Sequence, residues 1–280
     1  MKIFNLTNEK KIIICAHQGA WGGNIPGNSK AAFEIAIAQG ADMVELDVTA
    51  SSDGELFVFH PTMEERCLGK KIDIRQMRSS DVKKLQFLNC GGGWTGEKLL
   101  TLDDAFEHLK GRCYINVDKF ADNPAEIIKK IKAHCIEDQI VVKCDPIDSV
   151  FEQLETQAPW IQYLAIVSEP CNHNPYEIHE MLKKRALNYV GLEVVFRKLP
   201  SVMASDELIE KLHADGKLVW GNAIVFDVRY KLSADHGDDV ALRGDPDYGW
   251  GWFVDHGFDI IQTDWTRELK LYLERKSRLV

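Results

Sequence analysis

The 280-residue sequence has no long hydrophobic segment and no excess of positive charge. Its apolar run near the amino terminus is interrupted by His17, and it is too short for a membrane span or for the core of a signal peptide. Lysine and arginine number 34 against 43 aspartates and glutamates, which gives a net charge of −9. Nucleic acids and anionic membranes attract basic proteins, so neither is expected as a partner. We expect a cytoplasmic protein without stable membrane insertion.

The sequence also lacks any Cys-x-x-Cys pair. Its seven cysteines are odd in number, and several lie in apolar, strand-like runs, which favours reduced thiols over disulfides. No internal repeat, low-complexity tract or linker divides the chain. We therefore predict a single domain over residues 1–280, and no pattern in the sequence indicates an oligomeric state.

Short β-branched runs alternate with amphipathic stretches along the whole chain. The predicted strands are 12–17, 43–48, 114–117, 140–143, 163–167, 189–194, 218–221 and 259–263. The predicted helices are 29–39, 102–109, 124–134, 147–156, 176–184, 205–214, 248–255 and 267–273. Eight strands, each followed by a helix, predict a (β/α)8 TIM barrel of the α/β class. A doubly wound sheet is the competing fold, but no Gly-x-Gly-x-x-Gly turn follows the first strand.

Two segments interrupt the alternation. An extra extended run at 56–60 follows the second strand through a turn, and residues 61–100 form an insertion without clear periodicity. The second segment, 226–247, is long and polar. Insertions after barrel strands usually shape the active site, so we expect a lid over the barrel mouth.

Glu45 and Asp47 are the most informative residues of the sequence. Side chains on a strand alternate between its two faces, so both carboxylates point the same way from the predicted strand 43–48. Two carboxylates on one face of an apolar strand are unfavourable unless a cation or strong hydrogen bonds satisfy them. His17 and His60 end the apolar runs on either side in the sequence. This combination suggests a metal site flanked by two acid–base groups.

Other polar residues also lie near predicted strand ends, where barrel active sites are built. They are Asn116, Asp118, Lys143, Glu193, Asn222 and Asp264. Each alone is compatible with a structural role, as a hydrogen-bonded core residue or a solvated residue of the rim. The convergence of three carboxylates, two histidines and a lysine on one barrel mouth favours a functional site.

The sequence resembles the glycerophosphodiester phosphodiesterase family, which shares its barrel with bacterial phosphatidylinositol-specific phospholipase C. The resemblance extends from residue 12 to about residue 275 and is most specific in the first sixty residues. The segments that carry it are His17-Gln18-Gly19, Pro26-Gly27-Asn28-Ser29, Gly40-Ala41-Asp42-Met43-Val44-Glu45-Leu46-Asp47-Val48, Asp53-Gly54, Phe59-His60-Pro61, Tyr114-Ile115-Asn116-Val117-Asp118 and the closing strand 258–264.

The resemblance implies a metal-dependent phosphodiesterase. Glu45, Asp47 and Asp118 would bind one divalent cation, Ca²⁺ or Mg²⁺, because hard oxygen ligands prefer hard cations. His17 would act as general base and His60 as general acid, although the opposite order stays open. The small-molecule substrate would be a glycerophosphodiester, hydrolysed to glycerol 3-phosphate and an alcohol. The expected substrate-binding residues are Gln18, Lys119, Lys143, Glu193, Asn222 and Trp265.

Five positions depart from the family pattern. Gln18 replaces an arginine that contacts phosphate, and Gly27 replaces a glutamate. Pro61 replaces an aspartate that could orient His60, Asp118 is one methylene shorter than the usual glutamate, and Phe120 replaces a lysine. The three metal ligands and both histidines remain, which favours an active variant. The alternatives are a lysophospholipid-type or cyclising phosphodiesterase, and a non-catalytic barrel that binds phosphodiesters.

Overall fold

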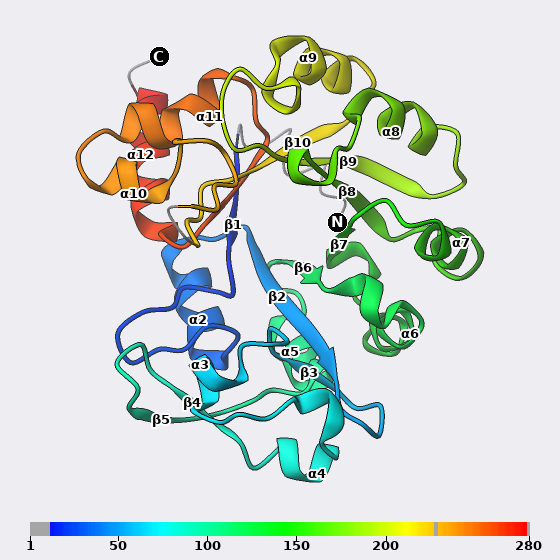
Figure 1. Ribbon diagram of the computed structural model, residues 1–280, viewed down its shortest axis with the longest axis vertical. Helices are drawn as coiled ribbons and strands as arrows, with labels where there is room; N and C mark the ends of the chain where they lie inside the picture. The colour runs from blue at the N-terminus through cyan, green and yellow to red at the C-terminus, as the bar shows by residue number, and fades with distance from the viewer. Residues whose placement is uncertain (1–11, 227–228, 279–280) are drawn as a thin grey trace.

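The computed structural model describes residues 12–226 and 229–278, and in this part of the chain eight parallel strands close into a barrel (Figure 1). The strands follow one another around the barrel in chain order, and the pairing of the first with the second closes it. They are β1 (Ile13–Ala16), β2 (Met43–Ala50), β6 (Tyr114–Asp118), β7 (Ile140–Cys144), β8 (Gln162–Ser168), β9 (Asn188–Val195), β10 (Leu218–Asn222) and β11 (Ile260–Thr263). The predicted TIM barrel is confirmed.

Helices connect the strands and surround the barrel (Figure 1). They are α2 (Lys30–Gln39), α5 (Leu102–Leu109), α6 (Pro124–His134), α7 (Asp148–Gln157), α8 (Pro175–Leu182), α9 (Asp206–Ala214), α11 (Trp252–Asp255) and α12 (Thr266–Arg278). Side-chain caps begin several of them: the hydroxyl of Ser29 accepts the Ala32 amide, and Thr101 forms a capping box with Asp104. None of the described helices is long and apolar enough to cross a membrane.

The strands separate two hydrophobic layers. On β2, Val44, Leu46 and Val48 join the large cluster between the barrel and its helices. Met43, on the opposite face, joins a smaller cluster that fills the amino-terminal part of the barrel interior. Residues two and four positions after it, Glu45 and Asp47, share its face. The interior therefore changes from apolar to charged toward the carboxyl ends of the strands.

The insertion after the second strand is more ordered than its sequence indicates. The extra extended run predicted at 56–60 is found as β3 (Leu56–Val58), and residues 61–100 contain α3 (Glu64–Leu68), α4 (Ser79–Val82), β4 (Gln86–Leu88) and β5 (Trp94–Lys98). These elements form without a clear periodicity in the sequence because the insertion and β3 share a small hydrophobic core. That core comprises Phe57, Phe59, Leu68, Ile74, Val82, Leu85, Phe87 and Leu99. The antiparallel pairing of β3 with β2 continues with a hydrogen bond from the Phe59 amide to the Asp47 carbonyl, so that the next residue, His60, follows directly after this contact.

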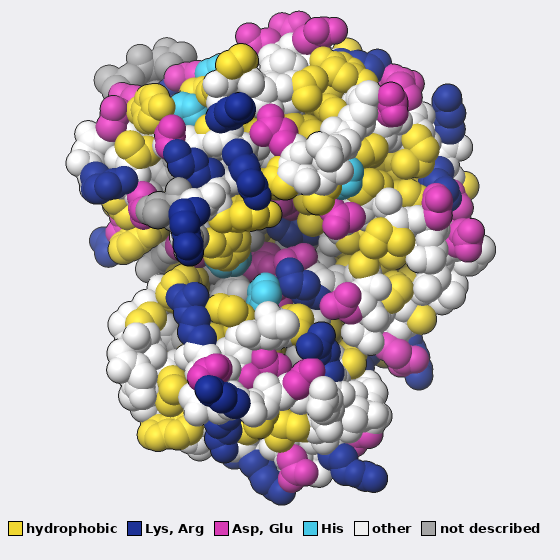
Figure 2. All heavy atoms as spheres, in the orientation of Figure 1, with side chains coloured by type: hydrophobic (Ala, Val, Ile, Leu, Met, Phe, Trp, Pro, Cys, Tyr) yellow, Lys and Arg dark blue, Asp and Glu magenta, His cyan; other side chains and the backbone are white. Residues whose placement is uncertain are grey.

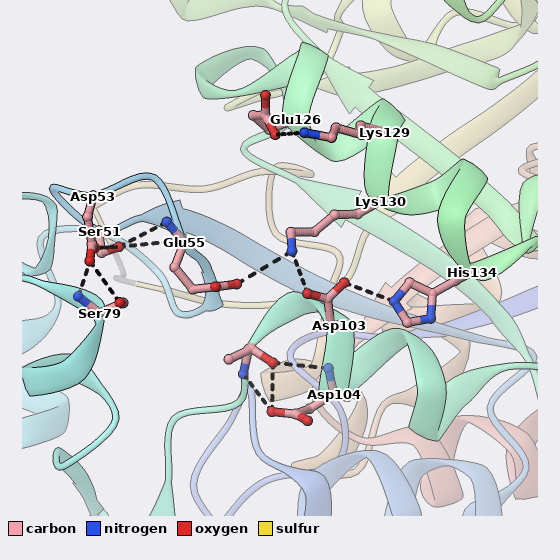
Figure 3. Close-up of polar contacts among 11 residues, drawn as sticks. Ser51, Asp53, Glu55, Ser79, Asp103, Asp104, Glu126, Lys129, Lys130 and His134 are labelled. Carbon is pink, nitrogen blue, oxygen red and sulfur yellow. Dashed lines mark hydrogen bonds and ion pairs between the residues drawn. The ribbon is translucent and has the colours of Figure 1, made fainter.

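Polar contacts anchor the turn between β2 and β3 to the barrel helices (Figure 3). Lys130 of α6 forms ion pairs with Glu55 of this turn and with Asp103 of α5, and His134 Nε2 lies 2.9 Å from Asp103. On the other side of the turn, Asp53 accepts hydrogen bonds from Ser51 and Ser79. These contacts fix the hairpin that carries His60.

The segment before β11 also differs from expectation. The long connection after β10 contains a short helix, α10 (Asp238–Leu242), and the predicted helix 248–255 begins as a π-helical turn over Asp247–Gly251 before α11. Gly249 allows this close packing, since a Cβ there would lie 2.8 Å from the Gly237 carbonyl oxygen. Both segments that interrupt the alternation, 56–100 and 226–247, thus contain regular secondary structure within their described residues.

Candidate active site

Three carboxylates converge at the mouth of the barrel. Glu45 and Asp47 point inward from β2, and Asp118 ends the neighbouring strand β6, in register with Asp47. One carboxylate oxygen from each lies within 4.8 Å of the others. We call these three residues the acidic corner. Figure 2 shows a hollow at the centre of the same face, in which acidic, basic and histidine side chains are exposed.

The turn after β1 supplies hydrogen bonds to the acidic corner. The Gln18 amide donates to Glu45 at 2.8 Å, and the Gln18 side chain donates to Asp47 at 2.7 Å. Asn28 donates a further bond of 2.9 Å to Asp47. A Cβ on Gly27 would lie 2.7 Å from the side-chain oxygen of Gln18, so the glycine makes room for the glutamine. Gln18 and Gly27, two of the departures from the family pattern, therefore belong to one local rearrangement.

Charge is unevenly compensated within the acidic corner. Burial, followed by the charge of Asp47, raises the pKa of Glu45 well above its ordinary value. Burial also acts to raise the pKa of Asp118, but the ammonium groups of Lys119 and Lys143 outweigh it and lower that pKa. Lys119 Nζ lies 2.9 Å from Asp118 and 3.8 Å from Asp47. Of these two lysines, Lys119 contacts the acidic corner directly, whereas Lys143 is paired with Glu193.

The donor set of the acidic corner fits a hard divalent cation. Its three closely spaced carboxylates offer oxygen ligands only, which is the chemistry that Ca²⁺ and Mg²⁺ prefer. Burial and the neighbouring charge of Asp47 raise the pKa of Glu45, and a cation bound beside it would favour its charged form. Glu45, Asp47 and Asp118 are therefore suited to hold the cation that the family resemblance implies.

His17 is anchored next to the acidic corner. Its Nδ1 lies 2.8 Å from Asp264 Oδ1, and the same oxygen accepts a 3.1 Å bond from the Trp21 indole. Burial acts to lower the pKa of His17, but the hydrogen bond and charge of Asp264, with Glu45 and Asp47, raise it to about 9. This anchoring leaves Nε2 of His17 available for chemistry.

Asp264 is itself held by a buried carboxylate. Asp238 accepts hydrogen bonds from the Asp264 amide at 2.9 Å, from Thr263 at 2.7 Å and from the Trp250 indole at 2.7 Å. Burial and the charge of Asp264 raise the pKa of Asp238 to about 7. The position of His17 thus depends on two successive carboxylates.

His60 is oriented by the backbone. Its Nδ1 donates to the carbonyl oxygen of Pro61 at 2.8 Å. The preceding residue, Phe59, donates its amide to the carbonyl of Asp47, so His60 follows directly after the β2 contact. The proline thus supplies through its carbonyl oxygen an acceptor that its side chain lacks, and His60 keeps its Nε2 free.

Lys143 and Asn222 both contact Glu193 inside the barrel. Lys143 Nζ lies 2.9 Å from both Glu193 and Gln262, and 4.6 Å from the centre of the Trp220 ring. Asn222 donates to the second oxygen of Glu193 at 2.8 Å. All of these side chains are buried. The alternative of a solvated rim lysine at position 143 is therefore wrong.

The structure thus gathers most of the predicted site residues at one end of the barrel. Gln18 and Lys119 contact the acidic corner, and Trp265 follows β11 with about half of its surface exposed. The partner roles of Asp264 and Asp238 were not predicted. Asp264 stands at a predicted strand end, whereas no local pattern marks Asp238. Trp220 is fully buried, which agrees with a packing role.

A second group of possible metal ligands comprises His179, Glu180 and Asp215. Asp215 precedes β10, so this group lies at the amino-terminal end of the barrel, away from the mouth. Lys183 Nζ lies 2.7 Å from Asp215, and Lys211 Nζ lies 2.8 Å from Glu180. Lysines already neutralise these carboxylates, so the group stabilises the contact between α8 and α9.

The seven cysteines are free, as predicted, but only Cys15 and Cys144 are buried.

Comparison with solved structures shows the class of fold to which this chain belongs. A family model described only as a domain of unknown function matches residues 163–273, less than half of the chain. A solved glycerophosphoryl diester phosphodiesterase of Parabacteroides distasonis superposes on 100% of this chain and 93% of its own, with a TM-score of 0.74 and 18% identity. A phosphodiesterase of Oleispira antarctica, solved with the product sn-glycerol-3-phosphate, gives a TM-score of 0.69 at 19% identity over 94% of this chain and 96% of its own. The fold is that of the TIM-barrel phosphodiesterases.

Sequence comparison finds curated relatives that match parts of the chain. The chain is 29% identical over 140 residues to the glycerophosphodiester phosphodiesterase of Caldanaerobacter subterraneus, covering 47% of this chain and 57% of that relative. It is 31% identical over 93 residues to the glycerophosphodiester phosphodiesterase of Bacillus subtilis, covering 33% of this chain and 30% of that relative. The matched segment thus spans little more than half of the first relative and less than a third of the second. Over these parts of its length, the chain is similar to glycerophosphodiester phosphodiesterases.

Proposed function

We propose that this protein is a metal-dependent phosphodiesterase that hydrolyses glycerophosphodiesters to glycerol 3-phosphate and an alcohol. The observation that carries the proposal is the acidic corner, with His17 anchored beside it and His60 fixed at the end of the adjoining hairpin. The resemblance to glycerophosphodiester phosphodiesterases, and a neighbour in fold solved with sn-glycerol-3-phosphate, supports the substrate class.

Two histidines with free Nε2 atoms can divide the proton transfers of a displacement at phosphorus. Without a cation, Asp264, Glu45 and Asp47 raise the pKa of His17 to about 9. A bound cation would offset the charge of Glu45 and Asp47, so that His17 could take the proton of the attacking water, and Asp264 would stabilise the imidazolium formed. His60, held through Nδ1 by the Pro61 carbonyl, donates a proton from Nε2 to the leaving alcohol oxygen. The bond between phosphorus and that oxygen breaks as the bond to the water oxygen forms.

Positive charge at the site would balance the phosphate. A divalent cation, Ca²⁺ or Mg²⁺, would be held by Glu45, Asp47 and Asp118 and would stabilise negative charge on the phosphate in the transition state. Lys119 lies next to two of these ligands and is placed to contact a phosphate oxygen. We expect the half-exposed Trp265 to contact the substrate from the rim, and Gln18 to hold the ligands in position. Lys143, Glu193 and Asn222 form a charge-matched, hydrogen-bonded group that would support the site rather than add net positive charge.

The proposal is tested by turnover of glycerophosphocholine and glycerophosphoethanolamine after EDTA treatment and addition of single metals. Activity should disappear with the metal and return with Ca²⁺ or Mg²⁺. Phosphorus NMR of the products should show glycerol 3-phosphate, whereas an accumulating cyclic phosphate would identify a cyclising enzyme. His17→Ala should lower kcat by about 10²–10⁴-fold, the usual contribution of a general base. Undiminished turnover by this variant, or by metal-free protein, would refute the mechanism.

A further inference from the structure

Two neighbouring loops at the barrel mouth expose an unusual concentration of large hydrophobic side chains. One follows β9 and the other follows β10. The exposed residues are Leu199, Val202, Val225, Phe226 and Tyr230, each between 39% and 59% exposed. We call these five residues the apolar rim. They make up five of the eleven exposed large hydrophobic residues in the described part of the chain.

The two loops form one surface. The Phe196 amide, at the start of the first loop, donates to the carbonyl of Leu232 in the second at 2.9 Å. The guanidinium of Arg197 lies 5.0 Å from the centre of the Tyr230 ring, which joins the loops through a cation–π contact. Single exposed hydrophobic residues are ordinary, but a contiguous apolar surface of this kind usually marks a site of binding.

The apolar rim begins at the proposed catalytic base. The ring of Phe226 meets the ring of His17 edge-on, with 5.4 Å between their centres. In Figure 2, hydrophobic side chains border the central hollow on one side, with basic side chains next to them. Arg197 and Lys198, which precede Leu199 in the sequence, are exposed basic residues. An apolar surface with cationic neighbours, continuous with a phosphate-cleaving site, matches an amphiphile that carries a phosphate.

We infer that the preferred substrate is an amphiphilic phosphodiester with one acyl chain on its glycerol, and that the apolar rim binds this chain. This inference rests on the proposed function and names its substrate class. If His17 activates the attacking water, an in-line displacement places the leaving alcohol on the opposite side of phosphorus, away from Phe226. The acyl chain therefore belongs to the glycerol that keeps the phosphate. One water is consumed, the bond from phosphorus to the head-group oxygen breaks, and an acylglycerol 3-phosphate and the head-group alcohol are released.

The inference is tested by comparing kcat/KM for glycerophosphocholine and for hexanoyl-lysophosphatidylcholine, the latter kept below its micelle concentration. We expect the acylated substrate to be favoured by about tenfold or more, since each buried methylene adds to binding. The double variant Leu199→Ser/Val202→Ser should reduce this ratio to about threefold or less. The matched control is Leu271→Ser on α12, which is as exposed as Val202 but lies on the outer helix layer, and should keep the ratio. An unchanged ratio in the double variant would overturn the inference while leaving the proposed function intact.

Binding is measured independently of turnover with monomeric dodecylphosphocholine, by calorimetry on the full chain with and without Mg²⁺. The double variant should bind this amphiphile at least about fivefold more weakly than the Leu271→Ser control. Rim-dependent binding without turnover of either substrate would refute the proposed function but support an amphiphile site. Sedimentation with vesicles of phosphatidylcholine and phosphatidylserine separates a bilayer from a monomeric lipid. Rim-dependent vesicle binding, together with equal kcat/KM for the two soluble substrates, would overturn the inference in favour of membrane docking.

Discussion

The acidic corner and the pair formed by Lys143 and Glu193 both lie inside the barrel, but their buried charges are compensated in different ways. In the pair, one ammonium meets one carboxylate, and Gln262 and Asn222 contribute further hydrogen bonds. In the acidic corner, three carboxylates lie close together, and Lys119 is the lysine in direct contact with them. A buried pair with matched charges is complete by itself, whereas three clustered carboxylates are suited to bind a further cation. The difference distinguishes a group that we expect to support the site from one that we expect to act in it.

The largest expected effect is on catalysis. Glu45→Gln removes one ligand of the acidic corner while keeping the shape of the side chain, so kcat in saturating Ca²⁺ or Mg²⁺ should fall by about 10³-fold. Steady-state hydrolysis of glycerophosphocholine measures the change. A loss of less than about tenfold would show that Glu45 does not hold a catalytic cation.

The same substitution at Glu193 should act on stability. Glu193→Gln leaves the buried Lys143 without its counter-charge, which should lower the free energy of unfolding by about 3–5 kcal/mol. Glu45→Gln, in cation-free protein, relieves repulsion from Asp47 and should leave stability equal or slightly higher. Urea unfolding of the two variants in EDTA provides the comparison. Equal destabilisation by both would remove the distinction between the two clusters.

The pH dependence of stability should also distinguish the two clusters. The pKa of His17 is raised from 6.5 to about 9, so its stabilising contribution is complete below pH 6.5 and is lost as the pH rises through 9. The raised pKa of Lys143 keeps its ion pair charged over this range. Cation-free protein should therefore lose about 2 kcal/mol between pH 6.5 and 9. Asp264→Asn should flatten the decline, and a decline of the same size in this variant would contradict the assignment.

The smallest effect is the stabilisation by bound metal. A cation at ten times its Kd should raise the free energy of unfolding by about 1.4 kcal/mol, because it binds the folded acidic corner. Thermal unfolding with and without Mg²⁺ or Ca²⁺ measures it. Glu193→Gln should keep this increment and Asp47→Asn should lose it. An increment that survives Asp47→Asn would place the cation elsewhere.

Local sequence patterns predicted the barrel and the shared face of Glu45 and Asp47, because both depend on short-range periodicity, whereas Asp118 joined them as a ligand through the family resemblance. Alternation with period two placed Glu45 and Asp47 on one face of β2, and the alternation of strands and helices predicted the eight-stranded barrel. The ordered insertion was missed because its hydrophobic core is assembled from residues as far apart as Phe57 and Leu99. A periodic pattern within a single segment does not predict contacts between segments so far apart in the sequence.

The sequence by itself determined the fold class, the three carboxylates and the two histidines at the mouth. Only the tertiary structure decided how each is held: Asp238 supports Asp264 across 26 residues, and Asp264 contacts His17 across 247. It also decided that Glu193 meets Lys143, because an irregularity in the pairing of β8 with β9 changes which side chains of β9 face inward. The residue types at strand ends follow from local chemistry. Their partners follow from closure of the barrel, which brings the first and last strands into contact.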